Sequence, residues 1–570
     1  MKKAVLLWFV LLMALIFTAC QGGHTGEEGG AASGEQGFYY FEGSNGADSW
    51  EPWISNGTAA GTVMISDINP EGGSYPWDFL RINPLYFSAD DGTNGRELWI
   101  SDRTTGGTFM VDICPGTCSS SPDNLTNVNG TLFFSANDGT GGEGTVSDGS
   151  NGYKLRASEG SNSELWKSDG TETGTVMVKD IYPGGSSSPS YLTNVNGTLF
   201  FRANDVTNGY ELWKSDGTDA GTVMVKDIDP GGSSFPSYLT NVNGTLFFQA
   251  YDATNGYELW KSDGTAAGTV MVKDIYPDGS SYPQYLTNVN GTLFFRADDG
   301  SNGRELWKSD GTDAGTVMVK DIYPGDSSYP QYLTNVNGTL FFQAYDVTNG
   351  YELWKSDGTA AGTVMVKDIY PGDSSYPQYL TNVNGTLFFQ AYDATNGYEL
   401  WKSDGTETGT VMVKDIYPGG SSYPQYLTNV NGTLFFRAND VTNGYELWKS
   451  DGTAAGTVMV KDIYPGDSSY LYNLTNVNGT LFFSANDSLN GYELWKSDGT
   501  ETGTVMVKDI NPDGEDSYPD DLTNVNGTLF FSADNGTNGC EPWKSDGTTA
   551  GTVMIADINP GPPNGIECID

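Results

Sequence analysis

The chain has 570 residues, and its 72 acidic and 28 basic side chains give a net charge of −44. Such an acidic balance excludes a general nucleic-acid-binding protein, because phosphate recognition needs a basic surface. An aromatic content of 13% excludes a disordered chain, and 75 glycines indicate many turns.

The N-terminal residues predict an export signal. Lys2 and Lys3 precede an apolar run over 4–18, which is short for a membrane span and typical of a signal peptide. The segment Ile16-Phe17-Thr18-Ala19-Cys20 resembles the lipobox of bacterial lipoproteins. An ordinary signal peptide cut near Ala19 is the alternative.

The lipobox resemblance implies that residues 1–19 are removed and that Cys20 is lipidated, so the protein would be anchored to a membrane of the bacterial cell envelope. By the same resemblance, Gln21 after the cysteine implies the outer membrane or the cell surface. Residues 20–37 are rich in Gly and Glu, which predicts a flexible, lipid-anchored linker. His24, the one histidine, lies in this linker, so histidine-based catalysis and histidine metal sites are excluded from the folded part.

Four further cysteines are Cys114, Cys118, Cys540 and Cys568. An even number in an exported chain predicts disulfides. A Pro-Gly-Thr turn separates Cys114 from Cys118 and can bring them together, which leaves Cys540 to pair with Cys568. Metal binding by the four cysteines is a weaker alternative, because their spacing matches no zinc pattern.

A repeated block organises the rest of the chain. Its tryptophan recurs every 47 residues from Trp166 to Trp495, and less regular copies lie on either side. We count eleven repeats between Phe38 and the C-terminus; their tryptophans are Trp53, Trp99, Trp166, Trp213, Trp260, Trp307, Trp354, Trp401, Trp448, Trp495 and Trp543.

The sequence pattern of each repeat predicts four antiparallel strands. In one unit the strands cover 191–195, 198–203, 210–214 and 222–228, separated by Asn-Gly and Asp-Gly turns. Four strands in about 47 residues match one blade of a β-propeller. We therefore expect an all-β fold with about eleven four-stranded blades over 38–570.

The number of rings stays open between one large ring and two rings of five and six blades, although the even spacing favours one. A β-solenoid is the runner-up fold. Nothing β-like precedes Phe38, so the first repeat lacks its innermost strand. We expect the C-terminal segment 565–570 to supply that strand and close the ring.

The block ELWKSDGT resembles the ELWxxDGT-repeat proteins of bacterial genomes, many of which are exported. The resemblance covers nearly the whole mature chain and implies no catalytic residues. With no histidine in the repeats and no carboxylate pair distinct from them, we expect no enzymatic activity.

The loop between the second and third strands offers oxygen ligands around a glycine, which suggests calcium. A solvated Asx-type turn is the alternative interpretation. The candidate ligands are Asp205, Asn208, Glu211, Asp252, Asn255, Glu258, Asp346, Asn349, Glu352, Asp393, Asn396, Glu399, Asp440, Asn443 and Glu446.

A binding surface is the leading functional hypothesis. In propellers this loop and the loops that join blades share one face, and here the joining loops are rich in Ser, Pro and Tyr, as antibody loops are in Ser and Tyr. The third repeat adds a 20-residue insertion within 139–163, which is either part of this surface or a duplication scar. The candidate binding residues are Tyr153, Lys154, Arg156, Tyr282, Tyr285, Tyr329, Tyr332, Tyr376 and Tyr379.

These observations predict an envelope lipoprotein that acts as a binding or adhesion scaffold for a protein or a carbohydrate. A passive structural surface protein and a calcium-binding propeller are the alternatives.

Overall fold

The computed structural model describes residues 37–44, 50–139, 162–512, 514–559 and 566. The chain divides into two units, Met1–Gly37 and Phe38–Asp570. The predicted signal peptide 1–19, Cys20 and nearly all of the linker 20–37 lie outside the described residues. The second unit holds every strand described below.

The strands of the second unit group into eleven antiparallel sheets, which we number as blades 1 to 11 in chain order. Blades 1 to 4 contain β1 (Tyr39–Ser44), β2 (Trp50–Ser55), β3 (Thr62–Met64); β4 (Trp77–Arg81), β5 (Leu85–Asp90), β6 (Arg96–Ser101), β7 (Thr108–Val111); β8 (Asp123–Val128), β9 (Thr131–Asn137), β10 (Ser163–Ser168), β11 (Val176–Lys179); and β12 (Ser190–Val195), β13 (Thr198–Asp205), β14 (Gly209–Ser215), β15 (Val223–Lys226). Blades 5 to 8 contain β16 (Ser237–Val242), β17 (Thr245–Asp252), β18 (Gly256–Ser262), β19 (Val270–Lys273); β20 (Gln284–Val289), β21 (Thr292–Asp298), β22 (Arg304–Ser309), β23 (Val317–Lys320); β24 (Gln331–Val336), β25 (Thr339–Asp346), β26 (Gly350–Ser356), β27 (Val364–Lys367); and β28 (Gln378–Val383), β29 (Thr386–Asp393), β30 (Gly397–Ser403), β31 (Val411–Lys414). Blades 9 to 11 contain β32 (Gln425–Val430), β33 (Thr433–Asp440), β34 (Gly444–Ser450), β35 (Val458–Lys461); β36 (Tyr472–Val477), β37 (Thr480–Asn486), β38 (Tyr492–Ser497), β39 (Val505–Lys508); and β40 (Asp520–Val525), β41 (Thr528–Asp534), β42 (Cys540–Ser545), β43 (Val553–Met554). Two short 3-10 helices, η1 (Ala59–Gly61) and η2 (Thr105–Gly107), occupy turns in blades 1 and 2.

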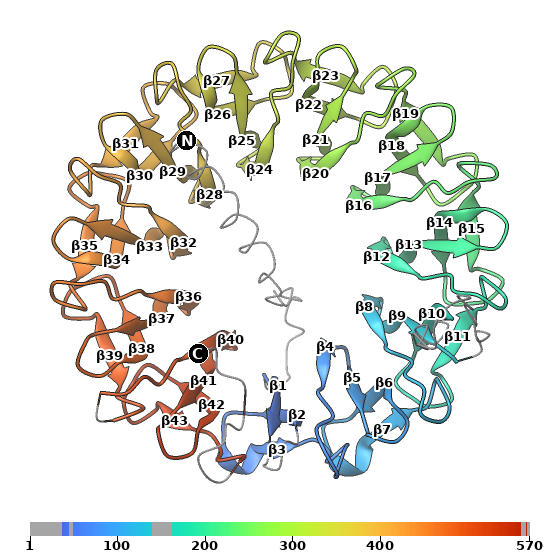
Figure 1. Ribbon diagram of the computed structural model, residues 1–570, viewed down its shortest axis with the longest axis horizontal. Helices are drawn as coiled ribbons and strands as arrows, with labels where there is room; N and C mark the ends of the chain where they lie inside the picture. The colour runs from blue at the N-terminus through green and yellow to red at the C-terminus, as the bar shows by residue number, and fades with distance from the viewer. Residues whose placement is uncertain (1–36, 45–49, 140–161, 513, 560–565, 567–570) are drawn as a thin grey trace, which may run out of the picture. The chain divides into compact units, whose positions relative to one another are not determined.

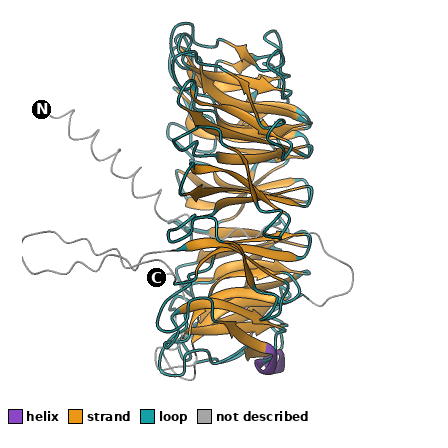
Figure 2. Cartoon of the chain, turned by 90° about the vertical axis from the view of Figure 1, so that its right-hand side faces the viewer, coloured by secondary structure: helices purple, strands orange, loops and turns teal. Residues whose placement is uncertain are grey.

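The eleven blades follow one another around a single ring, with the first strand of each four-stranded blade nearest the centre (Figure 1). The predicted β-propeller is therefore confirmed, and the ring is one rather than two. Seen edge-on, the strands run from one face of the ring to the other, with loops on both faces (Figure 2).

The second strand of each blade is buried on both sides. In blade 7 the residues Leu340, Phe341 and Phe342 are at most 3% exposed. Three apolar residues in a row suit a strand covered on both faces, because alternate side chains point toward opposite neighbouring blades.

An apolar cluster fills every junction between successive blades. At the junction of blades 6 and 7, Trp354 of blade 7 packs with Phe294 and Leu306 of blade 6. The repeated tryptophan therefore packs between neighbouring blades. Equivalent clusters occupy all eleven junctions.

The ring closes where blade 11 meets blade 1. Tyr39 and Phe41 of blade 1 share an apolar cluster with Phe530 of blade 11, and the rings of Tyr39 and Phe530 lie 5.2 Å apart. Ile566 joins this cluster and donates its N–H to the carbonyl of Cys540 at 2.8 Å. Blade 1 has three strands among the described residues. Most of the predicted closing segment 565–570 lies outside them.

Candidate functional site

Two sets of loops lie on the same face of the ring. Blade 7 illustrates this arrangement. Strands β25 and β26 pair as far as Asp346 and Gly350, so the loop between the second and third strands lies at this end of the blade. Tyr351, just after this loop, donates its N–H to the hydroxyl of Ser374 at 3.0 Å, and Ser374 lies in the loop leading to blade 8. We call this side of the ring the tyrosine face, for the exposed tyrosines that its loops carry.

A buried glutamate holds these loops in place. Glu352 has no exposed surface and accepts hydrogen bonds from the N–H of Ile369 at 3.1 Å and from the N–H and hydroxyl of Ser375 at 3.1 and 2.6 Å. Burial raises the pKa of Glu352 to about 8, against the opposing effect of these donors. An equally buried glutamate recurs in every blade; the set is Glu51, Glu97, Glu164, Glu211, Glu258, Glu305, Glu352, Glu399, Glu446, Glu493 and Glu541.

The candidate calcium ligands take two separate positions. Asp205 accepts hydrogen bonds from the N–H groups of Thr207 and Asn208 at 2.8 and 2.6 Å, and from the Asn208 side chain. This is an Asx-type turn, repeated around Asp252, Asp346, Asp393 and Asp440.

The third candidate ligand of this loop is turned inward. Glu211 is fully buried and accepts hydrogen bonds from the N–H of Ile228 and from the N–H and hydroxyl of Ser234. No group of three or more His, Cys, Asp or Glu side chains that could hold a metal occurs among the described residues. Calcium binding stays a prediction.

The predicted binding tyrosines of blades 6 to 8 are exposed. Tyr282 and Tyr285 precede or begin blade 6, and the same two positions recur before blades 7 and 8 as Tyr329, Tyr332, Tyr376 and Tyr379. Their exposed fractions lie between 36% and 47%. The predicted set omits the exposed aromatic residues at the same positions of other blades, although the repeat indicates them: Tyr191, Phe235, Tyr238, Tyr423, Tyr426 and Tyr470.

The six predicted tyrosines of blades 6 to 8 have left-handed backbone conformations. The φ angle is 47° at Tyr329 and 57° at Tyr332, and the other four lie in the same range. For a residue with a bulky side chain this conformation costs roughly 1–2 kcal/mol. The second tyrosine also sits at an irregularity between Gln331 and Thr334, where two residues of β24 face one residue of β25. The bulge and the left-handed conformation together turn the aromatic side chain of the second tyrosine out of the sheet.

Some exposed tyrosines stack on further tyrosines of the strands and loops beneath them. Tyr376 stacks on Tyr351 with centroids 5.6 Å apart, Tyr351 meets Tyr345 at 5.1 Å, and Tyr345 meets Tyr323 at 5.3 Å. A second ladder joins Tyr370, Tyr392, Tyr398 and Tyr423. The exposed rings of Tyr376 and Tyr423 therefore rest on a packed aromatic base that restricts their movement.

Carboxylates accompany the tyrosines on this face. Asp326 and Asp373 are exposed, three residues before Tyr329 and Tyr376. Half-buried Asp368 follows strand β27, and its pKa is raised by burial and by the nearby Asp346. The tyrosine face is thus both aromatic and acidic.

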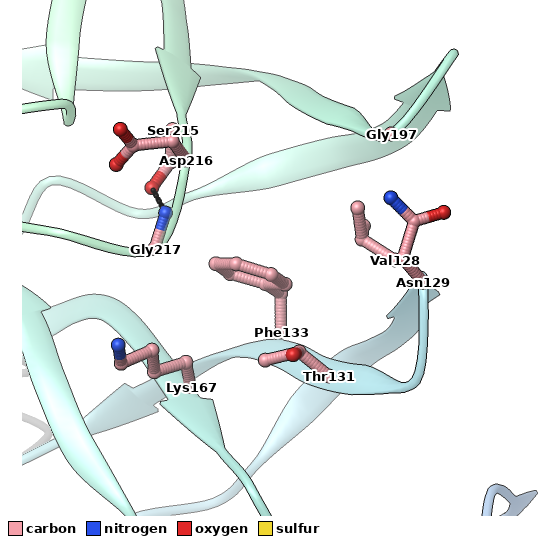
Figure 3. Close-up of a pocket in the computed structure, with 9 residues that line it drawn as sticks. All are labelled: Val128, Asn129, Thr131, Phe133, Lys167, Gly197, Ser215, Asp216 and Gly217. Atoms are coloured by element: carbon pink, nitrogen blue, oxygen red, sulfur yellow. Dashed lines mark hydrogen bonds between the residues drawn. The ribbon is translucent and has the colours of Figure 1, made fainter.

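The opposite face holds small pockets at the junctions between blades. One pocket of about 200 Å³ is lined by Phe133 and Lys167 of blade 3 and by Asp216 and Gly217 of blade 4, among others (Figure 3). The hydroxyl of Ser215 accepts the N–H of Gly217 there at 2.9 Å. A pocket of the same size and composition recurs between blades 5 and 6, so we assign these pockets to the repeated junction.

The cysteines and the insertion complete the predicted features. Cys114 and Cys118 are joined by a disulfide. Cys540 is buried and also disulfide-bonded. Its predicted partner Cys568 and the insertion residues Tyr153, Lys154 and Arg156 lie outside the described residues. On either side of the insertion β9 and β10 pair in the usual register. Within the described part of the chain, no helix has the length and hydropathy needed to cross a membrane.

No protein-family model matches the chain, and no curated protein matches it. Among solved structures, it is similar to a puromycin hydrolase, with 13% identity, a TM-score of 0.24, and coverage of 60% of this chain and 58% of that one. It is also similar to a puromycin-hydrolyzing peptidase from Mycobacterium tuberculosis, with 11% identity, a TM-score of 0.26, and coverage of 61% and 58%. Prolyl oligopeptidase B from Galerina marginata gives 13% identity, a TM-score of 0.27, and coverage of 63% and 54%.

The chain therefore spans between 54% and 58% of the length of these solved structures. Such low identities and TM-scores bring neither a family nor an activity to this chain.

Proposed function

We propose that the protein is a binding or adhesion scaffold of a bacterial cell envelope, which holds a protein or glycan partner on its tyrosine face. The observation that carries this proposal is the repeated pair of exposed tyrosines, kept in a costly left-handed conformation by the fold around them. Strained, exposed residues on a rigid framework are typical of binding surfaces.

The buried glutamates support the same proposal. Glu352 fixes the loop that carries the first exposed tyrosine of blade 8, because it accepts hydrogen bonds from Ser375 next to Tyr376. A surface that is ordered before binding loses less conformational entropy when the partner arrives. Tyrosine adds rigid contact area with only two side-chain torsions to fix.

A protein and glycan array probed with the whole chain tests this function. A variant with Tyr329→Ser and Tyr376→Ser should lose most of the binding signal. Serine is compatible with this position, since Ser121 and Ser188 occupy it in other blades with φ of 43° and 45°. The matched control is Glu407→Ala with Glu501→Ala, at exposed turns that carry alanine in other repeats. Equal signals from all three proteins would contradict the proposal.

The envelope location rests on Cys20 and is tested separately. If Cys20 is lipidated, Cys20→Ser should move the protein from the membrane fraction to the soluble fraction and abolish labelling by a fatty-acid probe. Unchanged labelling would contradict the lipid anchor while leaving the binding surface untouched.

A further inference from the structure

The second exposed tyrosine recurs at one position of six consecutive blades. It stands in the first strand of blades 4 to 9, and these strands, β12, β16, β20, β24, β28 and β32, follow one another around the centre of the ring (Figure 1). The six side chains are 45% to 47% exposed. They form an arc of aromatic rings, which we call the tyrosine arc: Tyr191, Tyr238, Tyr285, Tyr332, Tyr379 and Tyr426.

The backbone alone does not explain tyrosine at this position. The six tyrosines have φ between 55° and 57°. Blades 2, 3, 10 and 11 reach the same conformation, with φ of 53° to 59°, at Asp78, Asn124, Asn473 and Asp521. Asparagine and aspartate enter the left-handed region at a lower cost in free energy than tyrosine does. The reason for tyrosine in blades 4 to 9 therefore lies in its side chain.

The part of the ring that faces solvent is equivalent throughout the arc. An arginine lies over Tyr191, Tyr285 and Tyr426, with its guanidinium carbon 4.7 to 4.8 Å from the ring centroid. In blades 5, 7 and 8 a glutamine stands in place of this arginine, yet the exposed fractions of the tyrosines are the same. The arginine thus covers none of the surface that the other blades expose, and a ligand meets six like platforms.

Neighbouring platforms are close enough to be used together. Strand β24 of blade 7 contacts β20 and β28, the first strands of the blades on either side. Burial raises the pKa of Tyr332, and the nearby phenol groups of Tyr379 and Tyr285 raise it further. One extended molecule can therefore touch several members of the arc, and the binding contributions of these members then reinforce one another.

The groups around the arc favour an uncharged ligand that carries hydroxyl groups. Exposed Asp326 and Asp373 lie in the loops of this face and repel an anionic ligand. Half-buried Gln331 and Gln378 directly precede the arc tyrosines of blades 7 and 8, and an amide can both donate to and accept from a hydroxyl group. The face of a tyrosine ring carries partial negative charge, which attracts the C–H groups of a sugar ring.

We propose that the tyrosine arc binds an uncharged, linear glycan chain, with sugar rings stacked on the tyrosines of successive blades. This inference rests on the proposed function and names the partner class. A folded protein presents different side chains to the equivalent platforms, whereas a glycan chain presents one repeating unit to all of them. The repeat of the blades therefore matches a repeat in the ligand.

Calorimetric titration of the whole chain at 0.15 M salt tests the ligand class. The probes are the β-1,4-linked hexasaccharides of glucose, xylose, mannose and N-acetylglucosamine, and the α-1,4-linked hexasaccharide of glucose. We expect at least one to bind, and the corresponding monosaccharide to bind about ten-fold more weakly or worse, because a single sugar uses a single platform. Absence of binding by all five hexasaccharides, or equal binding by the monosaccharide, would overturn the inference.

Two variants with equal numbers of substitutions test the arc itself. Tyr285→Asn with Tyr332→Asn removes the two middle platforms and leaves two runs of two. Its matched control, Tyr191→Asn with Tyr426→Asn, removes the two ends and leaves a run of four. Asparagine keeps the backbone conformation, since Asn124 occupies this position with φ of 58°.

We expect the middle variant to weaken binding of the hexasaccharide by about ten-fold and the end variant by about three-fold or less, with unchanged melting temperatures. The two variants lose the same number of rings, so the difference between them reports contact with neighbouring platforms. Equal weakening by both variants would contradict a chain that lies along the arc.

Two further outcomes separate this inference from the proposed function. If no hexasaccharide binds but an array ligand binds in a manner dependent on Tyr329 and Tyr376, the scaffold function stands and the glycan partner is wrong. The cationic hexasaccharide of glucosamine and the anionic hexasaccharide of galacturonic acid should bind more weakly than the uncharged ligand. Tighter binding of either, with the same loss in the middle variant, would show that the arc takes a charged chain instead.

Discussion

At the residue scale, the buried glutamate of each blade is the most consequential side chain that the fold reveals. Glu352 joins three parts of the chain, since strand β26 carries it while Ile369 and Ser375 donate to it from the end of blade 7 and from the loop that follows. Removing it leaves these donors buried without an acceptor.

We therefore expect Glu352→Ala to lower the free energy of unfolding by about 2–4 kcal/mol, because unsatisfied buried donors and a cavity add up. Chemical denaturation of the whole chain measures this change. Glu407→Ala serves as control, because Glu407 is exposed and Ala360 stands at its counterpart in blade 7. A loss no larger than the control's would show that the glutamate does not hold the loops.

The same glutamates predict how stability depends on pH. Burial raises the pKa of Glu211 from its usual 4.5 to about 7 and that of Glu493 to about 8. The folded state therefore holds these protons more tightly than the unfolded state. Their contribution to stability is full below pH 4.5 and is lost as the pH rises toward 8.

The exposed aspartates of the Asp-Gly turns act in the opposite direction. The pKa of Asp216 is lowered, first by the hydroxyl of Thr218 and then by its N–H, so its contribution is lost in acid below about pH 4. We expect the melting temperature to be highest near pH 5 and lower at pH 8, as measured by calorimetry at constant ionic strength. A melting temperature that rises between pH 5 and pH 8 would contradict the raised pKa values.

At the element scale, the Asp-Gly turn between the third and fourth strands fixes the spacing of neighbouring blades. Gly358 has φ of 85°, and a Cβ atom there would lie 3.2 Å from Cζ of Phe294 in the preceding blade. Gly325 has φ of 87° but nothing within 4 Å of such an atom. The two glycines share a backbone conformation and differ in their packing.

This pair gives a direct test of the junction. We expect Gly325→Ala to cost about 1 kcal/mol from the left-handed conformation alone. Gly358→Ala should cost more, by another 1–3 kcal/mol, because the methyl group also presses on Phe294. Equilibrium unfolding of the two variants measures the difference between these losses in free energy of unfolding. Equal losses would contradict the prediction, because they would show that the junction accommodates the added methyl group at no cost.

At the scale of the whole molecule, the ring closes through a junction that no loop of the described chain bridges. Blades 8 and 9 remain tethered when their contact opens, whereas blade 11 and blade 1 lie at opposite ends of the described strands. When blades 11 and 1 separate, the chain therefore gains more conformational entropy than when blades 8 and 9 separate. We expect it to be the first junction to separate.

Two matched truncations test the closure. Phe530, 2% exposed, packs on Tyr39 of blade 1, and Phe388, 3% exposed, occupies the same position at the junction of blades 8 and 9. Phe530→Ala should speed amide hydrogen exchange most in blades 1 and 11 and lower the melting temperature more than Phe388→Ala does. Faster exchange spread evenly around the ring would contradict this order of opening.

The amino-acid sequence is enough to predict the repeat, the four strands of each unit, their turns and the face on which the tyrosines lie. These follow from local causes: Asn-Gly and Asp-Gly favour tight hairpins, and Leu-Phe-Phe runs need cover on both sides. The structure adds that the repeated tryptophan lies between blades, where a large apolar side chain is buried against the neighbouring blade.

The number of rings and the role of Glu352 and its counterparts become visible only in the folded protein. Ring number depends on how each blade rotates against the next, and this small angle is summed over eleven junctions. Proximity in the sequence groups Glu352 with Asp346 as a candidate ligand, yet the donors to Glu352 lie 17 and 23 residues further along the chain. Contacts between distant segments arise from packing, which a local pattern does not record.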